Sequence, residues 1–298
     1  MQEETKFYTC KNDRAFKEVF MRKENKDILI PLLECCLNIK IQDIEYLNLE
    51  DNVDNINVRR KSYDLRLSTD IGRIMIEVNA NIYDYSRMRQ FSYISNEYSH
   101  LILSGEDYDE DINVIQINFT YGMMKDFEEK YKYLYDDKDY RIYEVVDEED
   151  KKFVNNFKIL EFNMDYYMNL WYNKDKKLID KYKYLIMMNL DLSNLLKLSK
   201  DNEVIDKYME ELERVNKDPK FIEYMSYEED LRKKINTWKK RAKNEGISIG
   251  EKKGISIGKE EEKKELIIQF YKNNVDMETI SKATGLSINE IQNIVNNI

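Results

Sequence analysis

The sequence predicts an α/β fold, followed by a mainly helical region and a small helical module at the C-terminal end. Three observations predict it. Apolar residues recur at helical spacing over 13–24 and 26–38, and strand-like alternation follows over 41–49, 61–69 and 72–80. Helical spacing returns over 84–104 before the apolar run 112–120, and it places on one face Met88, Phe91, Ile94, Tyr98 and Leu101. The resulting order α, β, β, β, α, β indicates helices layered on a sheet rather than an all-β barrel.

Composition narrows the class of protein. The 298 residues are 42% hydrophobic and 36% charged, which allows a packed core in one or two domains. No apolar stretch is long enough for a membrane span, and the first residues lack the apolar core of a signal peptide. Three cysteines, two of them adjacent, make neither a disulfide framework nor a zinc site. We therefore expect a cytoplasmic protein that does not associate with a membrane.

Net charge and the histidine count argue against further classes of function. The formal net charge is −10, whereas a sequence-independent DNA coat needs positive charge to neutralise phosphates. His100 is the single histidine, so we do not expect a His-based triad or a three-His metal site. Carboxylates remain as the groups that can carry chemistry, and any contact with nucleic acid must be local.

The pattern changes after residue 120. Two strands are predicted at 140–146 and 157–163, and helices from about 165 to 243. We accordingly expect a core domain over 1–164 and a helical region over 165–245. The segment 232–243 carries seven basic residues and no acidic one, which indicates either a solvated helix face or a helix that contacts phosphates.

Glycine occupies every fourth position of 246–258, where the pentamer GISIG occurs twice. This indicates either a flexible linker or a helix with a small-residue face, and the helix would suit a homodimer. The module 259–298 has Asp276 as an N-cap and Ser287 with Glu290 as a capping box. Its outline is that of a helix-turn-helix, but the last helix contains no Lys or Arg, so a small helical bundle is the prediction.

The segment 61–80 carries the chemistry. With Asp70-Ile71 as a two-residue hairpin loop, Leu67 pairs with Ile74 and Leu65 with Ile76 on an apolar face. The same register sets Asp64 opposite Glu77, and Ser62 opposite Asn79. A shift of one residue would mix the two faces, so the hydrophobic pattern selects this pairing.

Two carboxylates opposed across a hairpin repel each other and need a compensating cation. Magnesium, which binds one or two carboxylates and otherwise water or substrate phosphate, is one answer. Such an ion polarises a phosphoryl oxygen and activates a water for attack on phosphorus. The alternative is that Arg66 and Arg73 neutralise Asp64 and Glu77 as surface ion pairs. The spacing leaves both open.

An Asp, a hairpin and then Glu-x-(Lys or polar), between two helices, resemble the core of PD-(D/E)XK nucleases. More specifically, the sequence is similar to the Rpn family of recombination-promoting nucleases, also described as PD-(D/E)XK transposases. The resemblance is carried, over nearly the whole chain, by NDRAFKEVF (12–20), IEYLNLE (44–50), KSYDLRLSTDIGRIMIEVN (61–79), RMRQFSYISNEY (87–98), LSGEDYDEDINVIQINFTY (103–121) and SKATGLSINEIQNI (281–294).

The resemblance implies a restriction-endonuclease-like core and roles for particular residues. Asp64 and Glu77 would bind Mg²⁺ or Mn²⁺, with the carbonyl of Val78 as a third ligand. Asp13 would reach the ion or its water, whereas Glu18 is interpreted as solvated. Asn79 stands where the family has Gln or Lys; it can hydrogen-bond and position the water, but it carries no charge to stabilise the pentavalent phosphate.

A local basic rim surrounds the hairpin in the sequence, and its members are predicted to hold DNA phosphates: Arg59, Arg60, Lys61, Arg87 and Arg89. Arg89 and Gln90 are also candidates for the polar contact that Asn79 lacks, although Gln90 is interpreted as part of an exposed helix face. The resemblance implies a metal-dependent DNA endonuclease linked to recombination or to mobile-element and phage-related DNA processing. The alternative is a catalytically silent DNA-binding or protein-interaction protein on a nuclease scaffold.

Overall fold

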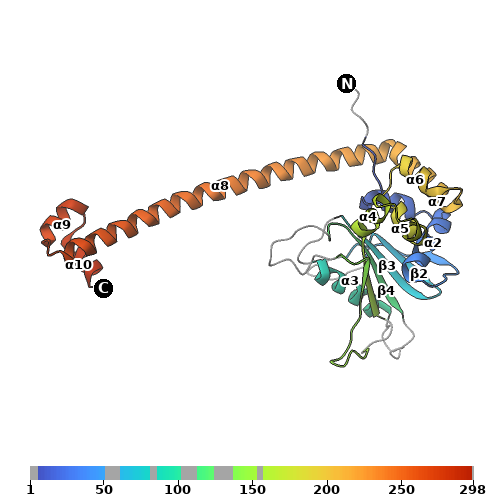
Figure 1. Ribbon diagram of the computed structural model, residues 1–298, viewed down its shortest axis with the longest axis horizontal. Coiled ribbons are helices and arrows are strands. Elements are labelled where there is room, and N and C mark those ends of the chain that lie inside the picture. The colour runs from blue at the N-terminus through green and yellow to red at the C-terminus, as the bar shows by residue number, and fades with distance from the viewer. Residues whose placement is uncertain are drawn as a thin grey trace, which may run out of the picture. The chain divides into compact units, whose positions relative to one another are not determined.

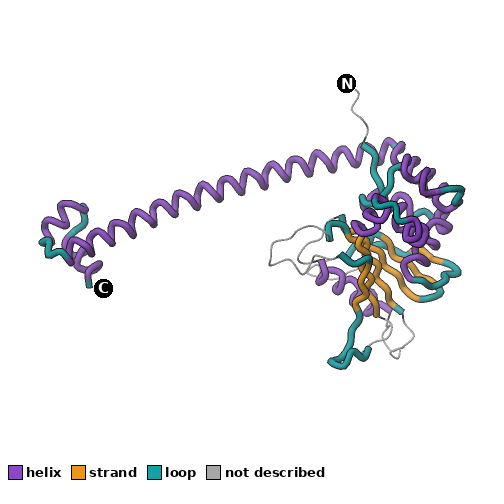
Figure 2. The backbone as a smooth tube through the Cα atoms, in the orientation of Figure 1, coloured by secondary structure: helices purple, strands orange, loops and turns teal. Residues whose placement is uncertain are grey.

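The computed structural model describes residues 6–50, 61–80, 86–101, 113–123, 137–152 and 157–296. The chain divides into two compact units, Met1–Ile222 and Glu223–Ile298. The finer boundaries predicted at residues 164 and 245 stay predictions. Within the first unit, the predicted α/β fold is confirmed (Figures 1 and 2).

The first unit contains a mixed sheet of six strands in the order β1-β2-β3-β4-β6-β5. Strands β3, β4 and β6 are parallel to one another, and the other pairings are antiparallel. The strands are β1 (Ile44–Tyr46), β2 (Leu65–Thr69), β3 (Gly72–Asn79), β4 (Val114–Thr120), β5 (Tyr140–Tyr143) and β6 (Phe157–Asn163). The strand predicted over 41–49 is therefore much shorter than expected.

Along the chain, helices come before the first strand, between β3 and β4, and after β6. They are α1 (Asp13–Phe20), the 3₁₀ turn η1 (Lys23–Asn25), α2 (Lys26–Leu37), α3 (Ser86–Leu101), α4 (Met164–Tyr172), α5 (Lys176–Met187), α6 (Leu192–Ser199) and α7 (Glu203–Lys217). Side-chain carboxylate or amide oxygens cap several of their first turns, as Asn12 caps α1 by accepting from the N–H of Ala15. The helical region predicted after residue 165 is confirmed.

The two faces of the sheet carry different helices. On one face, Met75 of β3 and Val114 of β4 pack with Ile94 of α3. On the other face, the ring of Phe119 in β4 lies 6.3 Å from that of Phe16 in α1. Figure 1 shows α3 on one side of β3 and β4, with α2 and α5 on the other. The open end of the β2–β3 hairpin, opposite its turn, therefore lies within reach of both α1 and α3.

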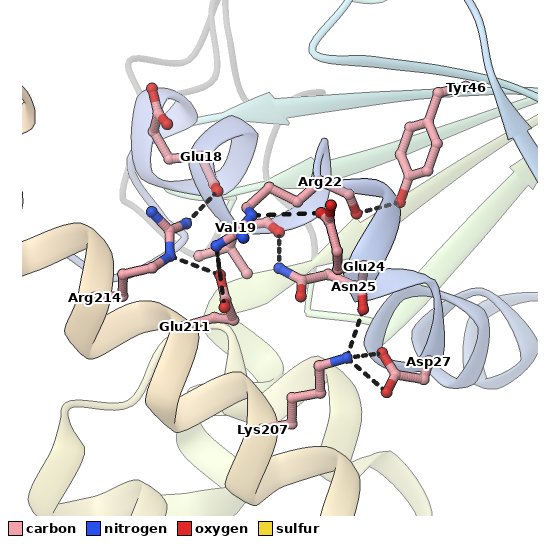
Figure 3. A network of polar contacts seen from close by, with 10 residues as sticks. All are labelled: Glu18, Val19, Arg22, Glu24, Asn25, Asp27, Tyr46, Lys207, Glu211 and Arg214. Carbon is pink, nitrogen blue, oxygen red and sulfur yellow. Dashed lines mark hydrogen bonds and ion pairs between the residues drawn. The ribbon is translucent and has the colours of Figure 1, made fainter.

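A polar network joins α7 to the segment that runs from α1 to α2 (Figure 3). Arg22 Nη1 lies 3.0 Å from Glu211 Oε2, and Arg214 Nη2 donates to the carbonyl oxygen of Glu18 at 3.0 Å. Lys207 pairs with Asp27 at 2.6 Å. Because three side chains of α7 bind this segment, the helical region fixes the position of α1 on the sheet.

The buried face of α3 differs from the prediction. Of the predicted apolar stripe Met88, Phe91, Ile94, Tyr98 and Leu101, Met88 is 72% exposed and Phe91 49% exposed. The helix instead buries Ser86, Gln90, Ile94 and Glu97. The interpretation of Gln90 as an exposed residue is wrong, because its side chain donates to Glu161 Oε1 at 3.1 Å inside the protein. Polar residues can occupy a buried face when the sheet supplies their partners.

The second unit holds most of α8 (Pro219–Lys272) together with α9 (Met277–Thr284) and α10 (Ile288–Val295). The glycine repeat 246–258 lies inside α8, so it is helical and not an irregular linker. The predicted N-cap at Asp276 and the capping box of Ser287 with Glu290 are confirmed. The end of α8 packs with α9 and α10 around a small core of Ile267, Ile280, Ile291 and Val295.

Candidate active site

The predicted hairpin register is confirmed, and it brings Asp64 beside Glu77. Leu65 pairs with Ile76 and Leu67 with Ile74, with Asp70-Ile71 in the turn. The ladder ends one pair before Asp64, which lies in a bend. There the Val78 N–H donates to Asp64 Oδ2 at 2.8 Å, and the Asp64 N–H donates to Glu77 Oε1 at 3.3 Å. These bonds bring the two acids together where β2 and β3 separate.

Each carboxylate has a cationic partner from a different helix. Lys17 Nζ of α1 lies 2.9 Å from Asp64 Oδ1, and Arg89 Nη2 of α3 lies 2.8 Å from Glu77 Oε2. These partners are not Arg66 and Arg73, the two arginines considered from the sequence. Arg66 instead binds Glu97 of α3, with Nε 2.7 Å from Oε2.

Burial and mutual repulsion perturb both acids. Asp64 is 8% exposed and Glu77 is 4% exposed. Burial raises the pKa of Asp64 above its ordinary value, although Lys17 opposes the shift. Burial, together with the charge of Asp64, raises the pKa of Glu77 to about 8, against the opposing charge of Arg89. Perturbed pKa values of this kind are typical of functional sites.

The other residues predicted to take part in catalysis or metal binding are neighbours of this pair. Asn79 follows at the end of β3, and its buried Nδ2 has no hydrogen-bond partner within the described part of the chain. Asp13 is exposed in the first turn of α1, and its charge acts on both Asp64 and Lys17. Val78 contributes its backbone N–H to Asp64. An uncharged donor and a third acid therefore flank the two carboxylates.

The predicted basic rim is described only in part. Arg59 and Arg60 lie outside the described residues. Lys61 donates to Asn96 Oδ1 at 2.8 Å, and the guanidinium of Arg87 lies 5.5 Å from the ring centre of Tyr143. Arg89 binds Glu77, so it belongs to the carboxylate pair itself. The phosphate-binding role of the rim stays a prediction.

Two features escaped the sequence analysis. Lys17 follows Asp13 by four residues, so the two share a helix face, and that spacing was the available signal. The second is a buried polar cluster around Glu161 of β6, which accepts from Gln90, from Thr120 at 3.3 Å and from Tyr143 at 3.1 Å. An acid inside the apolar run FKILEFN was the only hint of it.

The donor chemistry of the pair fits a divalent cation. Asp64 and Glu77 offer oxygen ligands, and Mg²⁺ is usually held by one or two carboxylates while it keeps several waters. Among the residues that the structure describes, no group of three acidic, His or Cys side chains is arranged to bind a metal. An ion here would therefore depend on Asp64 and Glu77, supplemented by backbone carbonyl, water or phosphate oxygens.

A hairpin that presents two buried acids between two helices, on an α/β sheet, defines a nuclease-like class of protein. The family model of the PD-(D/E)XK nuclease family transposases matches residues 10–242. The chain belongs to this family, which confirms the resemblance and supports a nuclease-like function. Nucleases of the PD-(D/E)XK type generally use divalent metal ions. Neither the search of curated proteins nor the search of solved structures found a match. No described helix is both long and apolar enough to cross a membrane.

Proposed function

We propose that the protein is a DNA endonuclease that hydrolyses phosphodiester bonds with Mg²⁺ or Mn²⁺ held by Asp64, Glu77 and the carbonyl of Val78. The observation that carries the proposal is a pair of neighbouring buried carboxylates: the Asp64 N–H donates to Glu77 Oε1, the Val78 N–H donates to Asp64 Oδ2, and both acids have raised pKa values. Burying two like charges together destabilises a fold unless cations compensate for them, and a bound metal ion would add to the compensation that Lys17 and Arg89 provide.

A bound divalent ion would polarise the phosphoryl oxygen and lower the pKa of an attacking water. The protein's own groups would then orient the reactants. Asn79 offers to the water or to a phosphate oxygen an amide donor that no described residue accepts from. In the reaction, the water oxygen bonds to phosphorus, one P–O ester bond breaks, and the leaving oxygen takes up a proton.

Plasmid nicking tests this proposal. Purified protein with Mg²⁺ or Mn²⁺ should nick supercoiled DNA, EDTA should stop the reaction, and Asp64→Asn should abolish it. A matched control is Asp43→Asn, because Asp43 is an exposed aspartate that also pairs with a lysine, Lys26, at 2.8 Å. Cleavage by Asp64→Asn at the wild-type rate would contradict the site assignment.

A second candidate is a catalytically silent DNA-binding or interaction protein on the same scaffold. The pairing of both carboxylates with Lys17 and Arg89, and an asparagine at position 79, favour it. Titration calorimetry separates the two candidates. No binding of Mn²⁺, together with retained binding of a DNA duplex, would support the silent protein.

The broader setting is also a proposal. The family to which the chain belongs favours a role in recombination or in mobile-element and phage-related DNA processing. The three free cysteines are compatible with a cytoplasmic setting. The glycine repeat in α8 would support a homodimer, and sedimentation of the full chain against a version truncated before residue 245 tests it. Equal, monomeric masses for both would contradict self-association through α8.

A further inference from the structure

We propose that Lys17 is a catalytic residue whose ammonium group contacts the scissile phosphate and supplies the positive charge that Asn79 lacks. This inference rests on the proposed function. It concerns a residue on α1, whereas Asp64 and Glu77 lie on the β2–β3 hairpin.

The position of Lys17 supports this role. Its Nζ lies 2.9 Å from Asp64 Oδ1, and its side chain is 23% exposed, so it faces the site and still reaches solvent. The charges of Asp64, Asp13 and Glu77 all act on it. Among the described residues, the second cation paired with the two acids is Arg89, but it is bound to Glu77 and lies over the ring of Tyr93 at 5.0 Å.

The backbone around Lys17 is held firmly in place. Arg214 of α7 donates to the carbonyl oxygen of Glu18, and Asn25 Nδ2 donates to that of Val19 at 2.7 Å (Figure 3). The preceding residue, Phe16, packs in the core at 4.8 Å from the ring of Phe20. A lysine on a fixed helix is preorganised, and such a charge costs little reorganisation when negative charge develops in the transition state.

Charge balance indicates what this ammonium group would bind. When ionised, Asp13, Asp64 and Glu77 together with Lys17 and Arg89 carry one net negative charge. A divalent cation would change this to one net positive charge, which matches the single negative charge of a phosphodiester. Asn79 contributes no charge, so without Lys17 the charges of these described groups and the ion would sum to zero and would attract phosphate less.

Lys17→Gln tests the inference, with Lys26→Gln as the control because Lys26 also pairs with an aspartate, Asp43. Circular dichroism establishes that each variant is folded. Calorimetry then measures Mn²⁺ binding without DNA, and single-turnover assays measure cleavage of a duplex at saturating Mn²⁺. The double variant Lys17→Gln/Asn79→Lys returns a lysine to the site from β3.

We expect Lys17→Gln to bind Mn²⁺ at least as tightly as the wild type, because a cation that competes for Asp64 is gone. We expect its cleavage rate to fall about 100-fold, the usual loss on removing one preorganised group that stabilises a transition state. The double variant should cleave at least about tenfold faster than Lys17→Gln. Lys26→Gln should cleave at the wild-type rate.

Three results would overturn the inference. Cleavage by folded Lys17→Gln within about twofold of the wild-type rate would show that no phosphate contact is lost. A loss of Mn²⁺ affinity in parallel with the rate would assign Lys17 to the positioning of Asp64 alone. Absence of cleavage by the wild type with either metal would overturn the proposed function as well, and only that result concerns both.

Discussion

The raised pKa of Glu77 predicts an unusual dependence of stability on pH in the metal-free protein. The native carboxyl has a pKa of about 8, against 4.5 for its ordinary value. Between these values the native state holds a proton that the unfolded chain has released. The free energy of unfolding must therefore fall as pH rises through this window, by up to about 1.4 kcal/mol per pH unit and about 5 kcal/mol in total.

Glu77→Gln removes this titration while it keeps the shape of the side chain. The groups that face Glu77 are Asp64 beside β2, Lys17 on α1 and Arg89 on α3, and all three remain in the variant. Urea unfolding followed by circular dichroism, in EDTA and from about pH 5 to about pH 9, gives the free energy of unfolding for both proteins. We expect a much flatter curve for Glu77→Gln, which becomes the more stable protein near pH 8.

A matched control is Glu34→Gln. Glu34 is an acid whose pKa is lowered, mainly by its hydrogen bond to Lys40, so it contributes no titration in this window. Its removal should leave the slope of the wild-type curve unchanged. Parallel curves for Glu77→Gln and the wild type would refute the assignment of Glu77 as a buried acid that is protonated near neutral pH.

Three further predictions concern the framework of the two units. Arg66→Met leaves Glu97, which is 0% exposed, without its cation, so the free energy of unfolding should fall by about 3–5 kcal/mol. The double variant Arg66→Met/Glu97→Leu should recover most of this loss, and equal losses in both variants would contradict the prediction. Gly72→Ala should lower the free energy of unfolding in urea by more than about 2 kcal/mol, because φ is +121° and the added Cβ would lie 2.4 Å from a backbone oxygen. The control Gly250→Ala, in a helix with open space around the added Cβ, should not destabilise the protein. Ser287→Ala should cost the C-terminal module about 1 kcal/mol through loss of its N-cap, measurable as faster hydrogen exchange of the α10 amides; unchanged exchange would count against the cap.

The hairpin was predictable because its signals are local. Alternation with a period of two fixes which residues share a face, and the loop Asp70-Ile71 fixes the register, so the opposition of Asp64 and Glu77 followed from about twenty residues of sequence. The capping box of Ser287 with Glu290 was predictable for the same reason, since its two side chains are three residues apart.

The partners of the site could not be predicted, because they come from distant parts of the chain. Lys17 meets Asp64 only because α1 packs on the sheet, and Gln90 is buried only because Glu161 lies across from it. Hydrophobic periodicity places apolar residues inside and has no means of placing a polar residue whose partner is far away in sequence. The error on the buried face of α3 therefore falls on residues that connect the helix to the sheet through polar contacts.

The same arrangement explains why the candidate site sits where three structural layers meet. Two buried acids destabilise the metal-free fold most at the pH at which both are ionised and able to bind a cation. Lys17 and Arg89 offset that cost. They come from helices on different faces of the sheet, and each binds one oxygen of a different carboxylate. The helices can supply these cations only if they are fixed, α1 by the network with α7 and α3 by its contacts to Arg66 and Glu161. The helical region after residue 164 thus contributes to the site without placing a residue in it, and substitutions in α7 that release α1 should weaken the pairing of Lys17 with Asp64.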